Sequence, residues 1–486
     1  MTPPDRLETP PFYDVEHRRT VVMCALAAVI AVGAVAVARF FIALLALITN
    51  ISFYGRLSFD EAQPWGHHLG PFVIVVPVIG ALIVGLMARY GSGAIRGHGI
   101  PEAMEQILTN ESKISPKVTI LKPISAAIAI GTGGPFGAEG PIIATGGALG
   151  SLVGQLLHTT PHERKTLLAA GAAAGMTAIF GTPVSAVLIA IELLLFEYRP
   201  RSLIPVAFAT ATAAGVRIAY MGSAAVFAMP LIAQPSGEAL ATYVVIGAIV
   251  GVASVAVTRT LYLIEEGFEH LPIHWMWWPA IGAVAVGVIG YFEPHTFGVG
   301  YSNIREILAG QIVGTVLLLF VILKFLSWSI ALGSGTSGGT LAPLFTIGGG
   351  LGALLGTWTA HLFPAFGIDP RIAALVGMAA IFAGASRALL TSIVFAFETT
   401  RQPIGLLPLL GGCTSAFLIS SLMMRYTIMT EKLAKRGTHV PTEYVAAEPQ
   451  TLAQHDAKAI RTRHLKLRSN RAKTNPVKDA TTDRYS

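Results

Sequence analysis

Charge is scarce in this chain. Of its 486 residues, 13% are Asp, Glu, Lys or Arg, whereas 53% are hydrophobic, and the mean hydropathy is +0.63. A soluble domain carries about 25% charged residues. The balance therefore argues against a soluble globular protein and predicts a polytopic membrane protein.

Cysteine is nearly absent, and so are the motifs of several enzyme classes. The two cysteines, Cys24 and Cys413, form neither a disulfide framework nor a metal-ligand spacing. No Gly-Lys-Ser/Thr sequence closes the glycine-rich run 131–140, which excludes a phosphate-binding P-loop there. The sequence shows no nucleophile–base pair and no metal-ligand cluster. We therefore predict no enzymatic activity, no metal and no cofactor.

The charge that is present gathers near the C-terminus. The formal net charge of +7 comes largely from the hydrophilic, basic stretch after Glu431, so it gives no indication of nucleic-acid binding. Basic segments stay on the cytoplasmic side of a membrane. We expect a solvated cytoplasmic tail there, with contact to anionic lipid as the alternative. Residues 1–19 are polar and lack the charged start and short apolar core of a signal peptide.

Apolar runs recur from residue 21 to residue 424, but glycine and proline interrupt them. Several runs are shorter than the ~20 residues that a spanning helix needs, and the chain holds 51 glycines and 29 prolines. Broken hydrophobic helices are tolerated in a membrane only where their ends are buried in protein or line a cavity. The pattern is typical of a transporter or channel whose half-helices meet near the midplane.

The runs divide into two halves. We predict a cytoplasmic N-terminal segment at 1–19, a first membrane repeat at 20–228, a linker at 229–237, a second membrane repeat at 238–436 and a basic cytoplasmic tail at 437–486. Each half has a glycine-rich interruption near its middle. Corresponding broken segments in two halves indicate an inverted repeat with a binding site between them.

Three glycine-rich motifs each lead into a proline and a helical run. They read Gly97-His98-Gly99-Ile100-Pro101-Glu102, Gly137-Ala138-Glu139-Gly140-Pro141 and Gly339-Thr340-Leu341-Ala342-Pro343. Glycine permits the positive-φ turns that aim backbone N–H groups inward, and a helix N-terminus is an anion-binding site. Helix packing also favours glycine, but three motifs of this form are hard to explain by packing.

Glu139 is the most informative single residue. It is the only ionisable residue between Ile124 and Val153. A charge at membrane depth costs roughly 2.5–3.5 kcal/mol or more, which makes such a residue a functional-site candidate by default. A carboxylate held at an anion site competes with a mobile anion for the same place. We therefore predict that Glu139 is a gate.

The three motifs resemble the signatures of the CLC family of chloride channels and proton–chloride antiporters. The family patterns G-S-G-I-P-E, G-[KR]-E-G-P and G-x-F-x-P match them in order and spacing, and Lys122 stands where the family keeps a buried lysine. The resemblance covers roughly residues 20–437. The tail after Arg436 is too short for the paired CBS modules that many eukaryotic relatives carry.

The resemblance implies an all-α polytopic membrane protein with the CLC fold, that is, ~18 membrane-embedded helices in two inverted-topology repeats. It implies a homodimer in contact with membrane lipids. From the short tail and compact core we expect the cell (inner) membrane, with both termini cytoplasmic. Each subunit would carry its own pathway for chloride, with other anions and protons possible. By family position Glu139 is the gate, and the chloride-binding residues are His98, Gly99, Ile100, Ala138, Gly140, Thr340, Leu341 and Met429.

Two departures from the family pattern alter the anion site. His98 stands where most chloride-selective members have serine; its ring either donates one N–H to the anion, with pH dependence if it protonates, or points away and leaves only its backbone in the pathway. Met429 stands where the family has a tyrosine whose hydroxyl closes the inner side. A thioether cannot donate a hydrogen bond, so we expect a softer inner constriction, with Tyr426 as an outside candidate to substitute.

A third departure concerns proton coupling. Aligning Gly181-Thr182-Pro183 with the family's N-A-P turn puts Leu193 where antiporters carry the inner glutamate that delivers protons, and leucine cannot relay one. Glu192 is retained and is either a proton group or a structural carboxylate at a helix end. Glu197, one helical turn beyond Leu193, could act through water. The proton-pathway candidates are therefore Glu139, Glu192 and Glu197.

Loss of the inner glutamate and of the tyrosine favours one function over its alternatives. We predict transmembrane chloride transport by a voltage-gated-type, Glu-gated anion channel or a weakly proton-coupled transporter. The alternatives are a proton/chloride antiporter with a non-standard proton route, and a relative that prefers fluoride or nitrate.

Overall fold

The computed structural model describes residues 12–438, 440 and 441. Residues 1–11, 439 and 442–486 lie outside the described residues, and with them most of the predicted tail and part of the predicted N-terminal segment. The long first helix already begins at Phe12, inside the range 1–19. Between the helices that end at Met221 and begin at Gly237, residues 222–236 contain no helix or strand.

The described residues form 17 α-helices. Those of the first half are α1 (Phe12–Tyr54), α2 (Val75–Tyr90), α3 (Ile100–Thr109), α4 (Pro116–Gly131), α5 (Glu139–Leu156), α6 (Pro161–Phe180), α7 (Pro183–Ile189) and α8 (Pro200–Met221). Those of the second half are α9 (Gly237–Glu269), α10 (Trp278–Phe292), α11 (Tyr301–Leu308), α12 (Gly314–Gly333), α13 (Leu341–Leu362), α14 (Pro370–Ser386), α15 (Leu389–Thr400), α16 (Leu406–Met423) and α17 (Glu431–Lys435).

Short helical segments fill several connections. The 3-10 turns are η1 (Pro64–Gly66), η2 (Gly70–Ile74), η3 (Gly93–Ile95), η5 (Trp275–Trp277), η6 (Pro294–Thr296), η7 (Pro364–Phe366) and η8 (Pro403–Gly405), and η4 (Ala190–Leu195) is a π-helical turn that continues α7. Within the described residues β-structure is limited to the isolated bridges Gly97–Ser337 and Gly137–Gly339. The prediction of an all-α polytopic fold with about 18 helices is confirmed.

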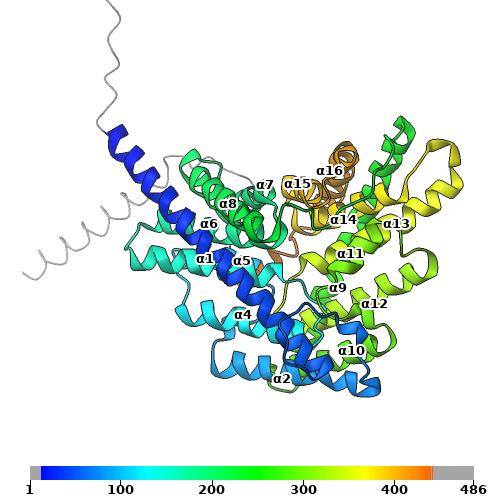
Figure 1. The fold of residues 1–486 in the computed structure, drawn as a ribbon, viewed down its shortest axis with the longest axis horizontal. Helices are drawn as coiled ribbons and strands as arrows, with labels where there is room; N and C mark the ends of the chain where they lie inside the picture. Colours follow the sequence, from blue (N-terminus) through cyan, green and yellow to red (C-terminus); the bar gives the residue numbers. More distant parts are fainter. Residues whose placement is uncertain (1–11, 439, 442–486) are drawn as a thin grey trace, which may run out of the picture.

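Eight helical stretches of the described range are long and apolar enough to cross a membrane, namely α1, α8, α9, α12 and α13, and α2, α10 and α16 together with the 3-10 turns η2, η5 and η8 that precede them. The others that matter for function are shorter, among them α3 with 10 residues and α11 with 8. Helices of that length begin or end inside the protein, as broken helices at membrane depth must. In Figure 1, α1 crosses the face of the molecule diagonally, and α11 to α14 lie to its right.

The two halves repeat the same local structure. In the first, the Lys122 ammonium on α4 donates to the carbonyls of Ile95 and Gly97, at 2.8 Å each. In the second, the Lys324 ammonium on α12 donates to Thr296 and Gly298, at 2.8 and 3.1 Å. Each lysine thus braces a glycine-rich turn that precedes a short helix, α3 in one half and α11 in the other.

The helix pairs next to these turns pack backbone against backbone. A Cβ added to Gly146 of α5 would collide with the carbonyl of Gly171 in α6, and the reverse also holds. Gly348 of α13 and Gly377 of α14 show the same mutual contact. Small residues allow this close approach of helices in membranes. As a result α5 and α13, whose first turns carry two of the motifs, are fixed firmly in the core.

Candidate anion pathway

All three glycine-rich motifs end at helix N-termini. Gly99, with φ at +96°, is the N-cap of α3, Ala138 is the N-cap of α5, and Thr340 is the N-cap of α13. Only glycine adopts such a φ without strain, and the turn at Gly99 is completed by its N–H donating to Glu102 at 2.7 Å. The first-turn N–H groups of a helix have no partner within it and carry the positive end of its dipole.

The motif loops are joined to one another. Gly137 and Gly339 exchange backbone hydrogen bonds of 3.2 and 3.0 Å, and Gly338 donates to Gly97 at 3.4 Å. The backbone of Gly140 lies so close to His98 that an added Cβ would collide with the carbonyl of His98. Residues more than 200 positions apart are thereby brought to one place, and the starts of α3, α5 and α13 converge there.

Glu139 is fully buried at this convergence. One carboxylate oxygen, Oε1, accepts the N–H of Ala342 in the first turn of α13 at 2.5 Å. The other, Oε2, accepts the Tyr301 hydroxyl at 3.2 Å. The side chain folds back over Gly137, where an added Cβ would overlap the carboxylate. A protein carboxylate therefore occupies a place where a helix N-terminus binds an anion.

No full positive charge donates to this carboxylate among the described residues. Lys122 and Lys324, both buried, donate to the backbone carbonyls already named. Partial charges on N–H groups attract an anion without the strong binding of an ammonium group. The arrangement is suited to an ion that must leave as well as enter.

The predicted site residues of the three motifs lie around the same point. Ile100, Ala138 and Leu341 are buried at 1%, 3% and 0% exposure. His98 is 5% exposed, and within the described part of the chain its Nδ1 has no hydrogen-bond partner. The Thr340 hydroxyl, also buried, has none either. Two side chains at the convergence thus have unused hydrogen-bonding capacity.

The sequence comparisons decide the family. Residues 79–421 match the family described as voltage gated chloride channel. The chain belongs to this family, the CLC family. Its members are membrane transporters and channels, not enzymes.

Relatives in the CLC family include proteins named as chloride channels and proteins named as exchange transporters. The chain is 28% identical over 385 residues to a ClcB-like chloride channel protein of Ralstonia nicotianae, covering 78% of this chain and 89% of the relative. It is 30% identical over 380 residues to the H(+)/Cl(-) exchange transporter ClcA of Yersinia pestis bv. Antiqua (strain Angola), covering 75% and 78%. The structure of a slow cyanobacterial Cl-/H+ antiporter superposes with a TM-score of 0.75 at 22% identity, over 85% of this chain and 97% of that one.

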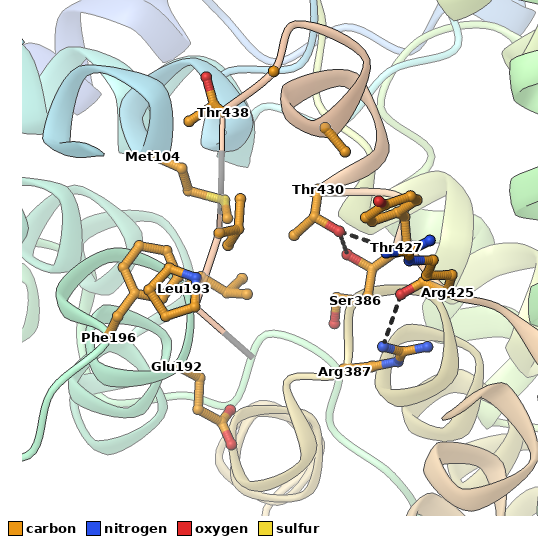
Figure 2. A pocket seen from close by; sticks show the side chains of 15 residues that line it. Met104, Glu192, Leu193, Phe196, Ser386, Arg387, Arg425, Thr427, Thr430 and Thr438 are labelled. Atoms are coloured by element: carbon orange, nitrogen blue, oxygen red, sulfur yellow. Dashed lines mark hydrogen bonds between the residues drawn. The ribbon is translucent and has the colours of Figure 1, made fainter. Parts of the chain in front are cut away.

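A cavity of about 390 Å³ in this CLC chain opens beside the last described residues, up to Pro441. Figure 2 shows Met104, Leu193 and Phe196 on one wall, with Thr430 and Arg425 facing them. Arg387 also lines the cavity and donates to the carbonyls of Met424 and Arg425. The guanidinium groups of Arg387 and Arg425 put two positive charges on the cavity lining, and the carboxyl group of Glu192 lies there as well.

The inner departures from the CLC pattern are found at or near this cavity. Leu193 is 4% exposed and lines it. Met429 is fully buried, and its backbone N–H donates to the Thr427 hydroxyl at 3.2 Å. Tyr426 is 40% exposed and lines the cavity beneath the Arg425 guanidinium, 5.3 Å from its ring centre.

The two remaining glutamates have separate partners. Glu192 accepts hydrogen bonds from the N–H groups of Leu390 and Thr391, both at 3.0 Å, at the start of α15. The expectation that Glu197 continues the same helix one turn beyond Leu193 is wrong. The π-helical turn ends at Leu195, and Phe196 has a positive φ of +52°.

Beyond that break, Glu197 is drawn into a polar cluster. It accepts the Ser202 hydroxyl at 2.8 Å, and its oxygens lie 3.8 Å from His162 and 3.7 Å from Lys165. The helix ends because Phe196 adopts the left-handed conformation, which redirects the chain.

Sequence reasoning missed the partners of Glu139. Ala342 acts through its backbone, which no residue type reveals. Tyr301 could have been found from an internal repeat, since Gly298-Val299-Gly300-Tyr301 has the glycine spacing of Gly97-His98-Gly99-Ile100.

Proposed function

We propose that this chain transports chloride through a pathway gated by Glu139, as an anion channel or a weakly proton-coupled transporter of the cell (inner) membrane. One observation carries the proposal. The Glu139 carboxylate accepts the Ala342 N–H at the start of α13, so it fills an anion position when ionised. Protonation removes its charge and lets it leave, and a chloride ion can then take its place.

The channel-like reading rests on the inner end of the pathway. Leu193 lines the inner cavity where a proton-delivering carboxylate is needed, and Met429 offers no hydroxyl to hold an inner anion. Glu192 is engaged by the first turn of α15, and Glu197 by Ser202. Glu192 lines the cavity, but both carboxylates already have these hydrogen-bond partners.

Proton–chloride exchange is the second candidate. The name of the Yersinia relative, an H(+)/Cl(-) exchange transporter, favours it. It requires a proton route to Glu139 that does not use position 193. Under this reading Glu192 or Glu197 passes protons through water in the cavity.

One measurement separates the two. The purified protein is reconstituted into liposomes loaded with chloride, and the liposomes are diluted into a medium of low chloride. External chloride and external pH are recorded together. Proton uptake in fixed proportion to chloride release establishes exchange. Chloride release without proton movement beyond the leak of protein-free liposomes establishes passive conduction. Absence of chloride flux at every pH overturns the chloride proposal and directs the assay to fluoride and nitrate.

The gate itself is tested with Glu139→Gln. Glutamine keeps the size of the side chain but cannot ionise, so chloride flux should persist and lose its dependence on pH. His98→Ser in parallel tests whether the imidazole contributes, since a pH profile that overlays the unmodified protein assigns it no titrating role. A silent Glu139→Gln protein that is still folded would exclude Glu139 as the gate.

We also propose a homodimer with both termini cytoplasmic, formed through α7, α8, α15 and α16. These helices lie along one edge of the molecule in Figure 1. The short helices α7 and α15 expose Val184 and Leu390, at 56% and 51%. Helices too short to span are not left open to lipid, so a second subunit is the cover that this face requires. Cross-linking of single cysteines at positions 184 and 390 tests it.

A further inference from the structure

The N-terminal turn of α11 repeats the design of the α3 turn. Gly298 and Gly300 have positive φ angles of +65° and +77°, as Gly97 and Gly99 have +89° and +96°. Lys324 braces the carbonyl of Gly298 in the way that Lys122 braces that of Gly97. The residue that follows the second glycine differs in kind between the two turns. It is apolar Ile100 in the first and Tyr301 in the second.

The ring of Tyr301 is held by aromatic neighbours from other helices. Phe180, at the end of α6, meets it edge-on at 5.6 Å between ring centres, and Phe227 does so at 5.9 Å. Phe180 is in turn packed edge-on against Phe395 of α15 at 4.9 Å. Edge-to-face contacts at these distances are favourable and fix the plane of the ring. The hydroxyl is therefore aimed before Glu139 arrives.

The Tyr301 hydroxyl donates to Oε2 of Glu139 at 3.2 Å, while Ala342 donates to Oε1. The two carboxylate oxygens are thus held by two different helices, α11 and α13. A hydrogen bond to an ionised carboxylate is roughly twice as strong as one between neutral groups. The tyrosine contact therefore favours the ionised, blocking state of Glu139 over the protonated state.

We propose that Tyr301 is a positioning residue that latches Glu139 in the blocking position and so sets how readily the pathway opens. The inference rests on the proposed function, in which Glu139 is the gate. The latch acts from α11, a helix that carries none of the three glycine-rich motifs. It supplies a donor that is lost when the gate swings away and regained when it returns.

Other titratable groups are found on the elements that carry or brace the two glycine-rich turns. They are His98 before α3, Glu102 on α3, Lys122 on α4 and Lys324 on α12. The lysines and Glu102 are engaged by backbone groups, at Gly97, Gly298 and Gly99. Among the described residues, Tyr301 is the side chain that hydrogen-bonds the Glu139 carboxylate.

Tyr301→Phe tests the latch, because it removes the hydroxyl and keeps the ring among Phe180 and Phe227. We expect chloride efflux at a pH where the unmodified gate is mostly closed to rise about tenfold, the change expected from one hydrogen bond to a charged group. The midpoint of activation by acid should move to higher pH by about one unit. Tyr243→Phe is the matched control, since the Tyr243 hydroxyl bonds only the backbone of Asp369, and it should leave the profile unchanged.

The double variant Tyr301→Phe/Glu139→Gln separates this inference from the proposed function. With no ionisable gate, removal of the hydroxyl should change nothing further. If Glu139→Gln alone leaves the pH dependence intact, the proposed gate fails. If Glu139→Gln abolishes it but Tyr301→Phe overlays the unmodified profile, or acts equally when combined with Glu139→Gln, only the latch fails.

A second variant guards against loss of folding in Tyr301→Phe. Phe180→Leu loosens the packing that aims the ring and leaves the hydroxyl in place. It should raise efflux in the same direction by a smaller factor. An unchanged pH profile in a folded Phe180→Leu protein, judged by its elution as a single species, counts against the latch.

Discussion

Glu192 and Glu398 each accept hydrogen bonds from the start of the helix that leads to the other. Glu192, just after α7, accepts the N–H groups of Leu390 and Thr391 at the start of α15. Glu398, near the end of α15, accepts the N–H groups of Val184 and Ser185 at the start of α7, at 3.0 and 2.8 Å. Each carboxylate stabilises the positive end of the helix that leads to the other. The pair joins α7 to α15.

This reciprocal arrangement predicts a structural effect for Glu192→Gln. Loss of the charge at a helix N-terminus should lower the free energy of unfolding by about 1 kcal/mol. Glu398→Gln is the matched variant and should cost a similar amount. The loss of stability is measured from the unfolding midpoints of both proteins in detergent. Proton movement is recorded separately, with both proteins in liposomes. A change in proton movement in Glu192→Gln alone would instead assign Glu192 to the proton pathway.

Gly140→Ala should damage the pathway more than the fold. The new methyl group collides with the carbonyl of His98 and forces the starts of α3 and α5 apart. Overpacking of this kind costs about 1–3 kcal/mol, and we expect chloride efflux to fall by about tenfold or more. Gly215→Ala in α8 is the control because its Cβ would meet open space. Equal efflux from the two variants would show that the approach of Gly140 to His98 is not needed.

Removal of the buried ammonium of Lys324 should destabilise the second half. Lys324→Met leaves the carbonyls of Thr296 and Gly298 without their donor, at a cost of about 1–3 kcal/mol. Lys122→Met should act in the same direction for the same reason, whereas exposed Lys117→Met should not. Denaturant unfolding of the purified proteins measures the three. Similar stability of Lys324→Met and the unmodified protein would indicate that water replaces the ammonium.

His67 should make the stability depend on pH. Burial, and then the neighbouring His68, lowers the pKa of His67 below 6.5, and its Nδ1 accepts the N–H of Leu69 at 3.2 Å. Because the folded pKa is lower than the unfolded one, the neutral ring stabilises the fold fully above pH 6.5. That contribution is lost as the pH falls through the folded value.

The measurement is the unfolding midpoint in detergent between pH 8 and pH 5. One proton changes the free energy of unfolding by at most about 1.4 kcal/mol per pH unit. His67→Phe, which can pack against Phe53 and Phe297 as the imidazole does, should flatten this slope. His158→Phe at an exposed position should not, and equal slopes in the two variants would refute the assignment.

The fold and the centre of the pathway could be predicted because local residues specify them. Gly99 is needed for a positive-φ turn, Gly140 for a close approach of two backbones, and Glu139 is an isolated charge in an apolar run. Each of these features can be recognised in a short stretch of sequence. The latch residue is different, because the contact between Tyr301 and Glu139 joins positions 162 apart in the chain. No local sequence pattern in α11 predicts which group the Tyr301 hydroxyl contacts.

The error at Glu197 has a backbone cause. A regular helix places residue 197 one turn above residue 193, but the π-helical turn at Ala190–Leu195 and the left-handed Phe196 end that register. The residues there are Ala, Ile, Glu and Leu, which favour an ordinary α-helix. Packing and the hydrogen bonds of Glu192 to the start of α15 override that preference, and neither can be predicted from the residues of the segment itself.

The mutual glycine contacts of α5 with α6 and of α13 with α14 have a consequence for the surrounding bilayer. Where these helices touch through their backbones, at Gly146 with Gly171 and at Gly348 with Gly377, no side chain separates them that could adopt a new rotamer when lateral pressure changes. Thinner or stiffer lipid can therefore tilt these pairs only as rigid units. The spacing between the start of α5 and the start of α13 is accordingly expected to stay the same in short-chain and long-chain membranes, and ion permeation with it.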